Sequence, residues 1–197
     1  MIYDVHLNEF VNQIINLSVL GFPIEPVTIL LKRFNFDVID FSPYIYYDST
    51  HYTRNLVYHC PEFEVLLLCW SPGQLSPIHG HEGEKCWMRV LKGSLYFINY
   101  HEMATNSADL ELISERHGDA GFVDGPAVIH KVENRTNDFA VSLHLYAKPF
   151  LQCDVYSIDE HSKAKMQIQY DTIYGKQLDK RINQQQLVII VQQLFGK

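Results

Sequence analysis

The sequence lacks any long apolar run. No stretch approaches the roughly 18 consecutive apolar residues that a membrane-spanning helix needs. The amino terminus, Met-Ile-Tyr-Asp-Val-His, also lacks the charged region, apolar run and cleavage site of a secretory signal. These absences predict a protein without a membrane partner and with a cytoplasmic location.

Positive charge is also scarce. The 197 residues include 16 Lys and Arg against 23 Asp and Glu, which gives a formal net charge of −7. No basic tract interrupts this acidic balance. Because nucleic-acid binding proteins rely on clustered Lys and Arg to neutralise phosphates, we expect no nucleic-acid partner.

Cysteine is present in only four copies, and no two of them form a Cys-x-x-Cys pair. A structural zinc site is therefore not expected. Without a secretory signal, free thiols are favoured over disulfides. The four positions are Cys60, Cys69, Cys86 and Cys153.

The residues that are present predict a folded, β-rich protein. Hydrophobic residues make up 47% of the chain and aromatic residues 13%, which is enough for a sizeable core. We expect a single domain over residues 1–197, with a helical region over about residues 1–40. A β-barrel is expected over about residues 41–175, followed by a carboxyl-terminal extension.

Periodicity locates the elements. Helical spacing predicts a helix over Val5–Leu20 that ends near Gly21, and a short helix over Pro26–Arg33. Lys92-Gly93 predicts a hairpin turn, and Asn183–Phe195 fits either a strand or a helix. Short apolar or alternating runs predict strands at Thr53–Tyr58, Phe63–Trp70, Lys85–Leu91, Leu95–Tyr100, Leu110–Ser114, Phe122–Val123, His130–Asn134, Ala140–Leu145 and Lys165–Tyr170.

A candidate metal site lies in the middle of the chain. His79 and His81 are two residues apart, so both side chains point to the same face of a strand. His130, from another strand, would complete a set of three imidazoles. Neutral imidazole suits iron, zinc, copper or nickel, although a His-x-His pair by itself is often incidental.

A second polar pattern follows in Ala140-Val-Ser142-Leu-His144-Leu-Tyr146. The alternation places Ser142, His144 and Tyr146 on one face of a strand. Ser142 could orient the imidazole of His144, which could in turn set the proton position on Tyr146. The alternative is a polar strand face that is simply solvated.

These motifs together resemble those of known proteins. The spacing Gly73…His79-x-His81-x4-Cys86…Gly93, followed by His130…Asn134, resembles the two cupin motifs, with Cys86 where an acidic ligand normally stands. With the Ser-x-His-x-Tyr strand, the chain is similar to the cysteine dioxygenases. The resemblance implies a mainly β fold, a jelly-roll-like cupin barrel with amino-terminal helices. It also implies one Fe(II) per chain, held by the three histidines, with O2 as cosubstrate.

The same resemblance implies roles for further residues. Arg54, in Tyr52-Thr-Arg54-Asn55, would bind the carboxylate of L-cysteine with help from Tyr52. Arg54 suits this role because its planar guanidinium binds carboxylate at two points. Cys86 would form a thioether with the ring of Tyr146, the alternative being a buried free thiol. Cys153 matches a cysteine beside the substrate pocket.

The implied activity is oxidation of L-cysteine by O2 to 3-sulfinoalanine. We expect the protein to be a monomer. Three alternatives remain open: a dioxygenase of another small thiol such as 3-mercaptopropionate or cysteamine, a metal-binding cupin sensor without catalysis, and a zinc or nickel cupin isomerase. The chain departs from the family after Tyr146, where Ala147-Lys148-Pro149 replaces the usual Ser-Pro-Pro. If this loop lines the substrate pocket, the departure could change the affinity for the substrate.

Overall fold

A computed structural model describes residues 4–104, 106–183 and 185–187. Two α-helices come first, α1 (Val5–Val19) and α2 (Ile24–Arg33), followed by the short 3-10 helices η1 (Phe36–Val38) and η2 (Ser42–Tyr44). Thirteen strands account for most of the remaining described residues. The predicted mainly β fold with amino-terminal helices is therefore confirmed.

Both ends of α1 follow from local chemistry. The Asp4 carboxylate accepts hydrogen bonds from the backbone N–H groups of His6 (2.8 Å) and Leu7 (3.1 Å), which otherwise lack intrahelical partners. Gly21 follows the helix with φ +71°, a conformation that glycine adopts without strain. The helix buries Leu7, Phe10 and Ile14 on one face, as the predicted periodicity requires.

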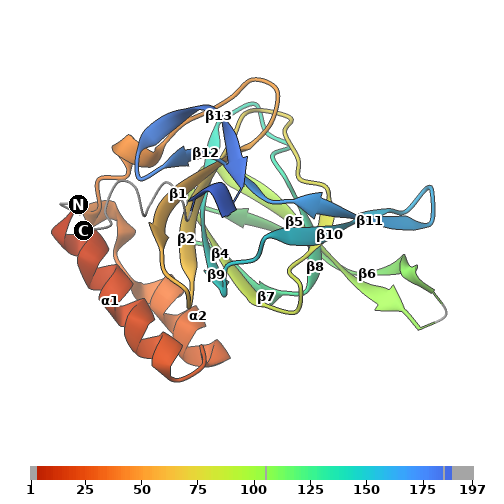
Figure 1. Cartoon of the computed structure of the whole chain (residues 1–197), viewed down its shortest axis with the longest axis horizontal. Helices are drawn as coiled ribbons and strands as arrows, with labels where there is room; N and C mark the ends of the chain where they lie inside the picture. Colours follow the sequence, from red (N-terminus) through yellow and green to blue (C-terminus); the bar gives the residue numbers. More distant parts are fainter. Residues whose placement is uncertain (1–3, 105, 184, 188–197) are drawn as a thin grey trace.

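The strands form two hydrogen-bonded sheets that face each other as a jelly-roll sandwich, rather than one closed barrel (Figure 1). The seven-stranded sheet has the order β13-β12-β1-β2-β9-β4-β7, and the six-stranded sheet has the order β11-β10-β3-β8-β5-β6. The bounds of the seven are β13 (Lys176–Asn183), β12 (Gln169–Ile173), β1 (Thr53–His59), β2 (Glu64–Trp70), β9 (Ala140–Ala147), β4 (Lys85–Lys92) and β7 (Val123–Ala127). Those of the six are β11 (Ser162–Gln167), β10 (Gln152–Ser157), β3 (Ile78–Gly80), β8 (Ile129–Glu133), β5 (Ser94–Met103) and β6 (Asn106–Asp119).

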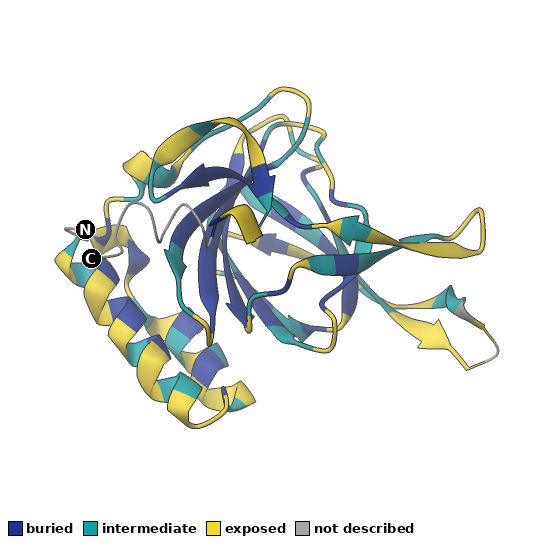
Figure 2. Ribbon diagram, in the orientation of Figure 1, coloured by how far each residue is buried: buried dark blue, intermediate teal, exposed yellow. Residues whose placement is uncertain are grey.

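Two hydrophobic cores result from this arrangement. The first lies between the two sheets and includes Leu66, Trp70 and Phe97. The second lies between the outer face of the seven-stranded sheet and the two helices, which cover that face in Figures 1 and 2. Strand β9 contributes to both, because its alternate residues point to opposite sides. Its apolar residues Val141, Leu143 and Leu145 face the helices, which leaves its polar residues to the space between the sheets.

Lys92-Gly93 is not a hairpin turn. Strand β4 belongs to the seven-stranded sheet and β5 to the six-stranded sheet, so the chain crosses from one sheet to the other at this point. Gly93 has φ +73°, and a Cβ atom there would lie 2.8 Å from the carbonyl oxygen of Phe139. The turn therefore requires glycine because of its positive φ and the close approach of a second backbone segment.

The predicted strand Lys165–Tyr170 is divided between β11 and β12 at Ile168. The seven-stranded sheet continues past residue 175, because β13 pairs with β12. The ambiguous segment Asn183–Phe195 lies mostly outside the described residues. Within the described ranges, no helix combines the length and the apolar character that crossing a membrane would require.

Candidate metal centre

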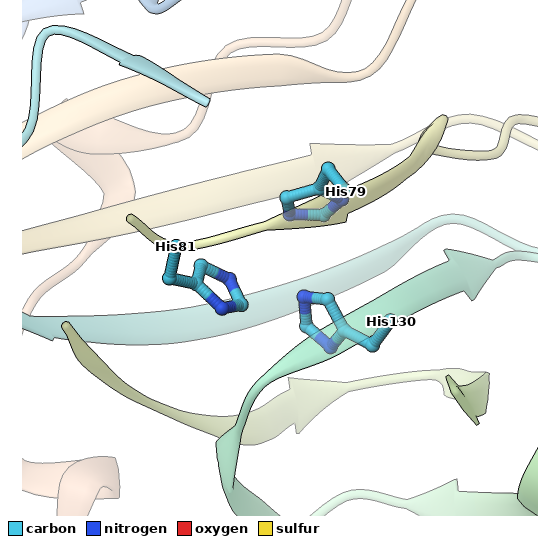
Figure 3. A group of neighbouring side chains, drawn as sticks. All are labelled: His79, His81 and His130. Atoms are coloured by element: carbon cyan, nitrogen blue, oxygen red, sulfur yellow. The ribbon is translucent and has the colours of Figure 1, made fainter. Parts of the chain in front are cut away.

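Three histidines converge between the two sheets (Figure 3). His79 lies on β3 and His81 directly follows it, whereas His130 lies on the neighbouring strand β8. The antiparallel pairing of these strands sets His79 directly opposite His130. The candidate ligand atoms of the three side chains all lie within 4.8 Å of one another. The sequence prediction that these three imidazoles meet is therefore matched by the geometry.

Burial keeps the imidazoles neutral. His81 and His130 are almost fully buried. Burial lowers the pKa of His79 to about 4, and burial together with His79 lowers that of His81 to about 3. The pKa of His130 is also held well below its ordinary value, first by burial and then by the other two histidines. At neutral pH the ring nitrogens therefore have lone pairs available for a metal ion.

The hydrogen bonds of the rings also suit metal binding. His79 Nδ1–H donates to the carbonyl oxygen of Pro77 (3.0 Å), and His81 Nδ1–H donates to that of Ala127 (3.2 Å). A carbonyl oxygen only accepts, so each Nδ1 carries the hydrogen and each Nε2 has a free lone pair. His81 Nε2 and His130 Nδ1 are buried and have no hydrogen-bond partner. A carbonyl that orients a ligating imidazole is typical of metal sites, so the donor set fits a divalent transition metal.

The cluster contains no carboxylate or thiolate within the described part of the chain. Cys86, at the position where the cupin motif has an acidic ligand, lies fully buried on β4. It is the direct cross-strand neighbour of Tyr146 on β9. Burial raises the pKa of the Cys86 thiol well above its ordinary value, so this sulfur is uncharged at neutral pH.

Ser142, His144 and Tyr146 form a chain of hydrogen bonds on the inner face of β9. Ser142 Oγ lies 2.8 Å from His144 Nε2, and the hydroxyl oxygen of Tyr146 lies 3.4 Å from His144 Nδ1. All three side chains are buried. The predicted alternation along this strand is thus matched, and the alternative of a solvated polar face does not apply because the three side chains are buried.

Trp70 sets the direction of the hydrogen bonds in the relay formed by Ser142, His144 and Tyr146. No pattern in the sequence predicts this contact. The indole Nε1–H of Trp70, which can only donate, bonds to Ser142 Oγ at 3.0 Å. The Ser142 hydroxyl is then left to donate to His144 Nε2. Burial, followed by the positive charge of Arg54, holds the pKa of His144 well below its ordinary value. The neutral ring therefore carries its one hydrogen on Nδ1 and donates it to Tyr146.

Tyr146 completes the relay as a hydrogen-bond donor. Its oxygen accepts from His144 Nδ1–H and from Arg54 Nη1–H at 3.2 Å, which leaves its own hydrogen free to point elsewhere. Burial raises the pKa of the Tyr146 phenol well above its ordinary value. The ring lies beside the metal cluster, with its centroid 5.9 Å from that of His81. Tyr146 is therefore a neutral phenol whose hydroxyl can donate a hydrogen bond to a bound ligand.

Arg54 extends from β1 into the same space. It is 5% exposed, and its guanidinium lies 5.3 Å from the centroid of the Tyr146 ring. Its Nε and Nη2 atoms are buried without hydrogen-bond partners. These two nitrogens form the edge of the guanidinium that binds a carboxylate at two points.

The two remaining predicted residues lie in the same core. Tyr52 stacks on Trp70 with ring centroids 4.5 Å apart, and so connects indirectly to Ser142. Cys153, on β10 of the opposite sheet, is fully buried, and burial raises the pKa of its thiol to about 11. The roles of Tyr52 and Cys153 in substrate binding remain predictions.

Comparison with known proteins agrees with this site. A family model described as Cysteine dioxygenase type I matches residues 5–159, a range that includes every site residue described above. Human cysteine dioxygenase type 1 is 29% identical over 157 residues, which cover 77% of this chain and 78% of the human protein. The protein of the same name from Danio rerio is 29% identical over 156 residues, 73% of this chain and 75% of that protein.

Among solved structures, a protein with a double-stranded β-helix domain from Klebsiella pneumoniae has a TM-score of 0.46 and 16% identity, covering 58% of this chain and 91% of that chain. The family match spans well over half of the sequence and both halves of the histidine cluster. The chain therefore belongs to the cysteine dioxygenase type I family of enzymes.

Proposed function

We propose that the protein oxidises the thiol of L-cysteine with O2 to give 3-sulfinoalanine. Both oxygen atoms join the sulfur, which loses four electrons to O2, and the thiol hydrogen is retained by the sulfinic acid. One observation carries the proposal: three neutral imidazoles, two of them almost fully buried, lie beside a buried arginine whose carboxylate-binding edge has no hydrogen-bond partner.

Fe(II), held by His79, His81 and His130, is part of this proposal. Such an ion would supply a redox centre for oxygen and a positive charge that favours the thiolate form of the substrate. The three neutral ligands leave the charge of the ion uncompensated. An anionic sulfur ligand therefore suits this site better than it suits a site that already contains a carboxylate.

Arg54 would bind and orient the substrate. Its Nε and Nη2 atoms would donate to the two oxygens of the substrate carboxylate, with Tyr52 adding a hydroxyl. Holding the carboxylate fixes where the thiol of the same molecule lies. The encounter of sulfur and oxygen then becomes effectively intramolecular, which removes most of its entropic cost.

Tyr146 would donate a hydrogen bond to the bound reactants. His144 and Arg54 hold its oxygen as an acceptor, so its hydrogen points away from both of them. Phe150 closes the same space, with its ring centroid 5.2 Å from that of Tyr146 and 5.9 Å from that of His81. An apolar wall at this place excludes water and strengthens the polar contacts inside.

We also propose a thioether between Cys86 and Tyr146. A carbon–sulfur bond would replace the S–H bond of Cys86 and one C–H bond of the Tyr146 ring, and O2 would accept the two hydrogens. The cross-strand pairing of the two residues supports this step. Intact-protein mass after exposure to iron and oxygen tests it: a loss of two hydrogen masses is expected, and Cys86→Ser should abolish this loss.

The activity is tested by oxygen consumption of the Fe(II)-loaded protein, prepared without oxygen and given L-cysteine, 3-mercaptopropionate or cysteamine. Two oxygens gained by cysteine as a sulfinate, and faster turnover of cysteine than of the other thiols, are expected. Arg54→Ala should weaken cysteine binding and leave cysteamine, which lacks a carboxylate, unaffected. Arg54→Lys keeps the charge but loses the two-point geometry, so we expect an intermediate loss.

If the protein binds cysteine without consuming oxygen, the proposed dioxygenase activity is contradicted and a role as a metal-binding sensor is favoured. Faster oxidation of cysteamine or 3-mercaptopropionate would instead reassign the substrate. The exposed Arg33 on α2 offers a control, and Arg33→Ala should leave both affinities unchanged. The predicted monomeric state and cytoplasmic location remain predictions.

A further inference from the structure

Glu64 is a buried carboxylate beside Arg54 that the proposed function does not use. It lies at the start of β2 and is fully buried. Its Oε2 atom accepts a hydrogen bond from the hydroxyl of Tyr170 at 2.6 Å. Its Oε1 atom lies 3.8 Å from Arg54 Nη2 and has no hydrogen-bond partner. A buried carboxylate is costly unless charges or hydrogen bonds compensate it, so these two neighbours explain how it is tolerated.

Two contacts of Glu64 favour its charged form. A distance of 2.6 Å is typical of a hydroxyl that donates to an ionised oxygen. Its cross-strand neighbours are His59 on β1 and Tyr146 on β9. Arg54, whose Nη2 atom lies near Oε1 of Glu64, carries a permanent positive charge. Burial raises the pKa of the Glu64 carboxyl, and the charge of Arg54 and the Tyr170 hydrogen bond oppose this rise.

Arg54 offers the same atom to two partners. Its Nη1 atom already donates to Tyr146, whereas Nε and Nη2 have no hydrogen-bond partner and form the edge that a substrate carboxylate would bind. Glu64 Oε1 faces this Nη2 from inside the protein. A bound substrate carboxylate would therefore share one guanidinium with a second carboxylate. The two carboxylates, that of Glu64 and that of the substrate, would repel each other strongly because water is excluded from this space.

We propose that Glu64 is a resident carboxylate that determines how tightly Arg54 binds the carboxylate of the substrate. In the empty pocket it compensates the buried charge of Arg54. In the occupied pocket it repels the incoming carboxylate and lowers its affinity. The inference rests on the proposed role of Arg54 and makes Glu64 a specificity-determining residue, because ligands without a carboxylate do not experience this competition.

The test compares the wild type with Glu64→Gln, which removes the charge at nearly constant shape. Isothermal titration of the Fe(II)-loaded proteins without oxygen gives the Kd of L-cysteine and of cysteamine. We expect Glu64→Gln to bind cysteine about tenfold more tightly and to bind cysteamine as the wild type does. Thermal unfolding provides a second readout: the ligand-free variant should unfold at a lower temperature, and saturating cysteine should narrow this gap.

Glu62→Gln is the matched control, since the same chemical change is made two residues away at an exposed position. If Glu64→Gln does not fold, the double variant Glu64→Met/Tyr170→Phe removes the charge together with the hydroxyl that donates to it, and the same tighter binding is expected. Unchanged or weaker cysteine binding in the folded variant would overturn the inference. If Arg54→Ala instead binds cysteine as tightly as the wild type, the proposed role of Arg54 itself fails.

Discussion

At the scale of single residues, the hydroxyl of Tyr146 receives two hydrogen bonds and has its own hydrogen available. Tyr146→Phe removes this donor while retaining the ring that packs beside His81. We expect turnover of cysteine to fall by about a hundredfold, with the bound iron content unchanged. Steady-state oxygen uptake together with metal analysis checks this. A variant that loses iron in parallel with activity would show that Tyr146 maintains the metal site instead.

Trp70 gives a second prediction at this scale, because its indole N–H sets the direction of the relay. Trp70→Phe removes that donor, so the His144 tautomer is no longer defined and the turnover number should fall more than the affinity for cysteine. Trp87→Phe is a matched control, since the equally buried Trp87 donates to Thr28 Oγ1 at 3.1 Å in the core beneath the helices. NMR of the His144 ring nitrogens measures the tautomer directly, and a tautomer unchanged by Trp70→Phe would contradict the assignment.

Periodicity predicts the candidate site only where its signal is local, whereas Arg54 and Cys86 are predicted by the resemblance to a family. His79 with His81, and Ser142 with His144, are two residues apart, so strand periodicity alone places each pair on one face. Trp70 and Glu64 have no such signal. Trp70 bonds to a residue 72 positions away, and Glu64 to one 106 positions away. These contacts depend on which strands become neighbours, and the pattern of one sequence does not show this.

At the scale of elements, the crossing between the two sheets depends on Gly93. Gly93→Ala introduces both a left-handed backbone strain and a contact of 2.8 Å with the Phe139 carbonyl oxygen. Gly73 has a similar φ of +78° but nothing within 4 Å of the added Cβ. Urea unfolding should therefore show a loss of about 1 kcal/mol for Gly73→Ala, and about 1–3 kcal/mol more for Gly93→Ala. Equal losses would show that the close contact relaxes without cost.

The same scale explains which strands the sequence missed. Alternation and apolar runs located β1, β2, β4 and β9, whose residues are mostly buried. Strand β3 is only three residues long, β10 fully buries only Cys153, and β13 is mostly exposed and polar. Strands that pair through their backbones without burying an apolar face leave no hydrophobic period to detect. The hairpin prediction at Lys92-Gly93 is wrong for a different reason: a sequence that favours a turn does not specify which sheet the next strand joins.

At the scale of the whole molecule, the fold brings the neutral imidazoles of His79, His81 and His130 together in one largely buried space between the sheets. Burial lowers the pKa of His79 to about 4 and contributes, with His79, to a value of about 3 for His81, against an ordinary value of 6.5. In the unfolded chain both imidazoles take up protons as the pH falls through 6.5. The folded, metal-free protein does not bind these protons until the pH approaches 4. Because the unfolded state binds more protons in this window, the free energy of unfolding must fall as the pH falls.

Each of these two histidines should contribute a slope of about 1.4 kcal/mol per pH unit between pH 6.5 and about 4. Urea unfolding of the metal-free protein across this range, compared with the His79→Gln/His81→Gln double variant, isolates their share from that of the carboxylates. The exposed His101 serves as the control, and His101→Gln should keep the wild-type slope. Bound Fe(II) should steepen the wild-type dependence, because protons then compete with the metal for the same nitrogens. A double variant with the wild-type slope would mean that these imidazoles are not kept neutral by the fold.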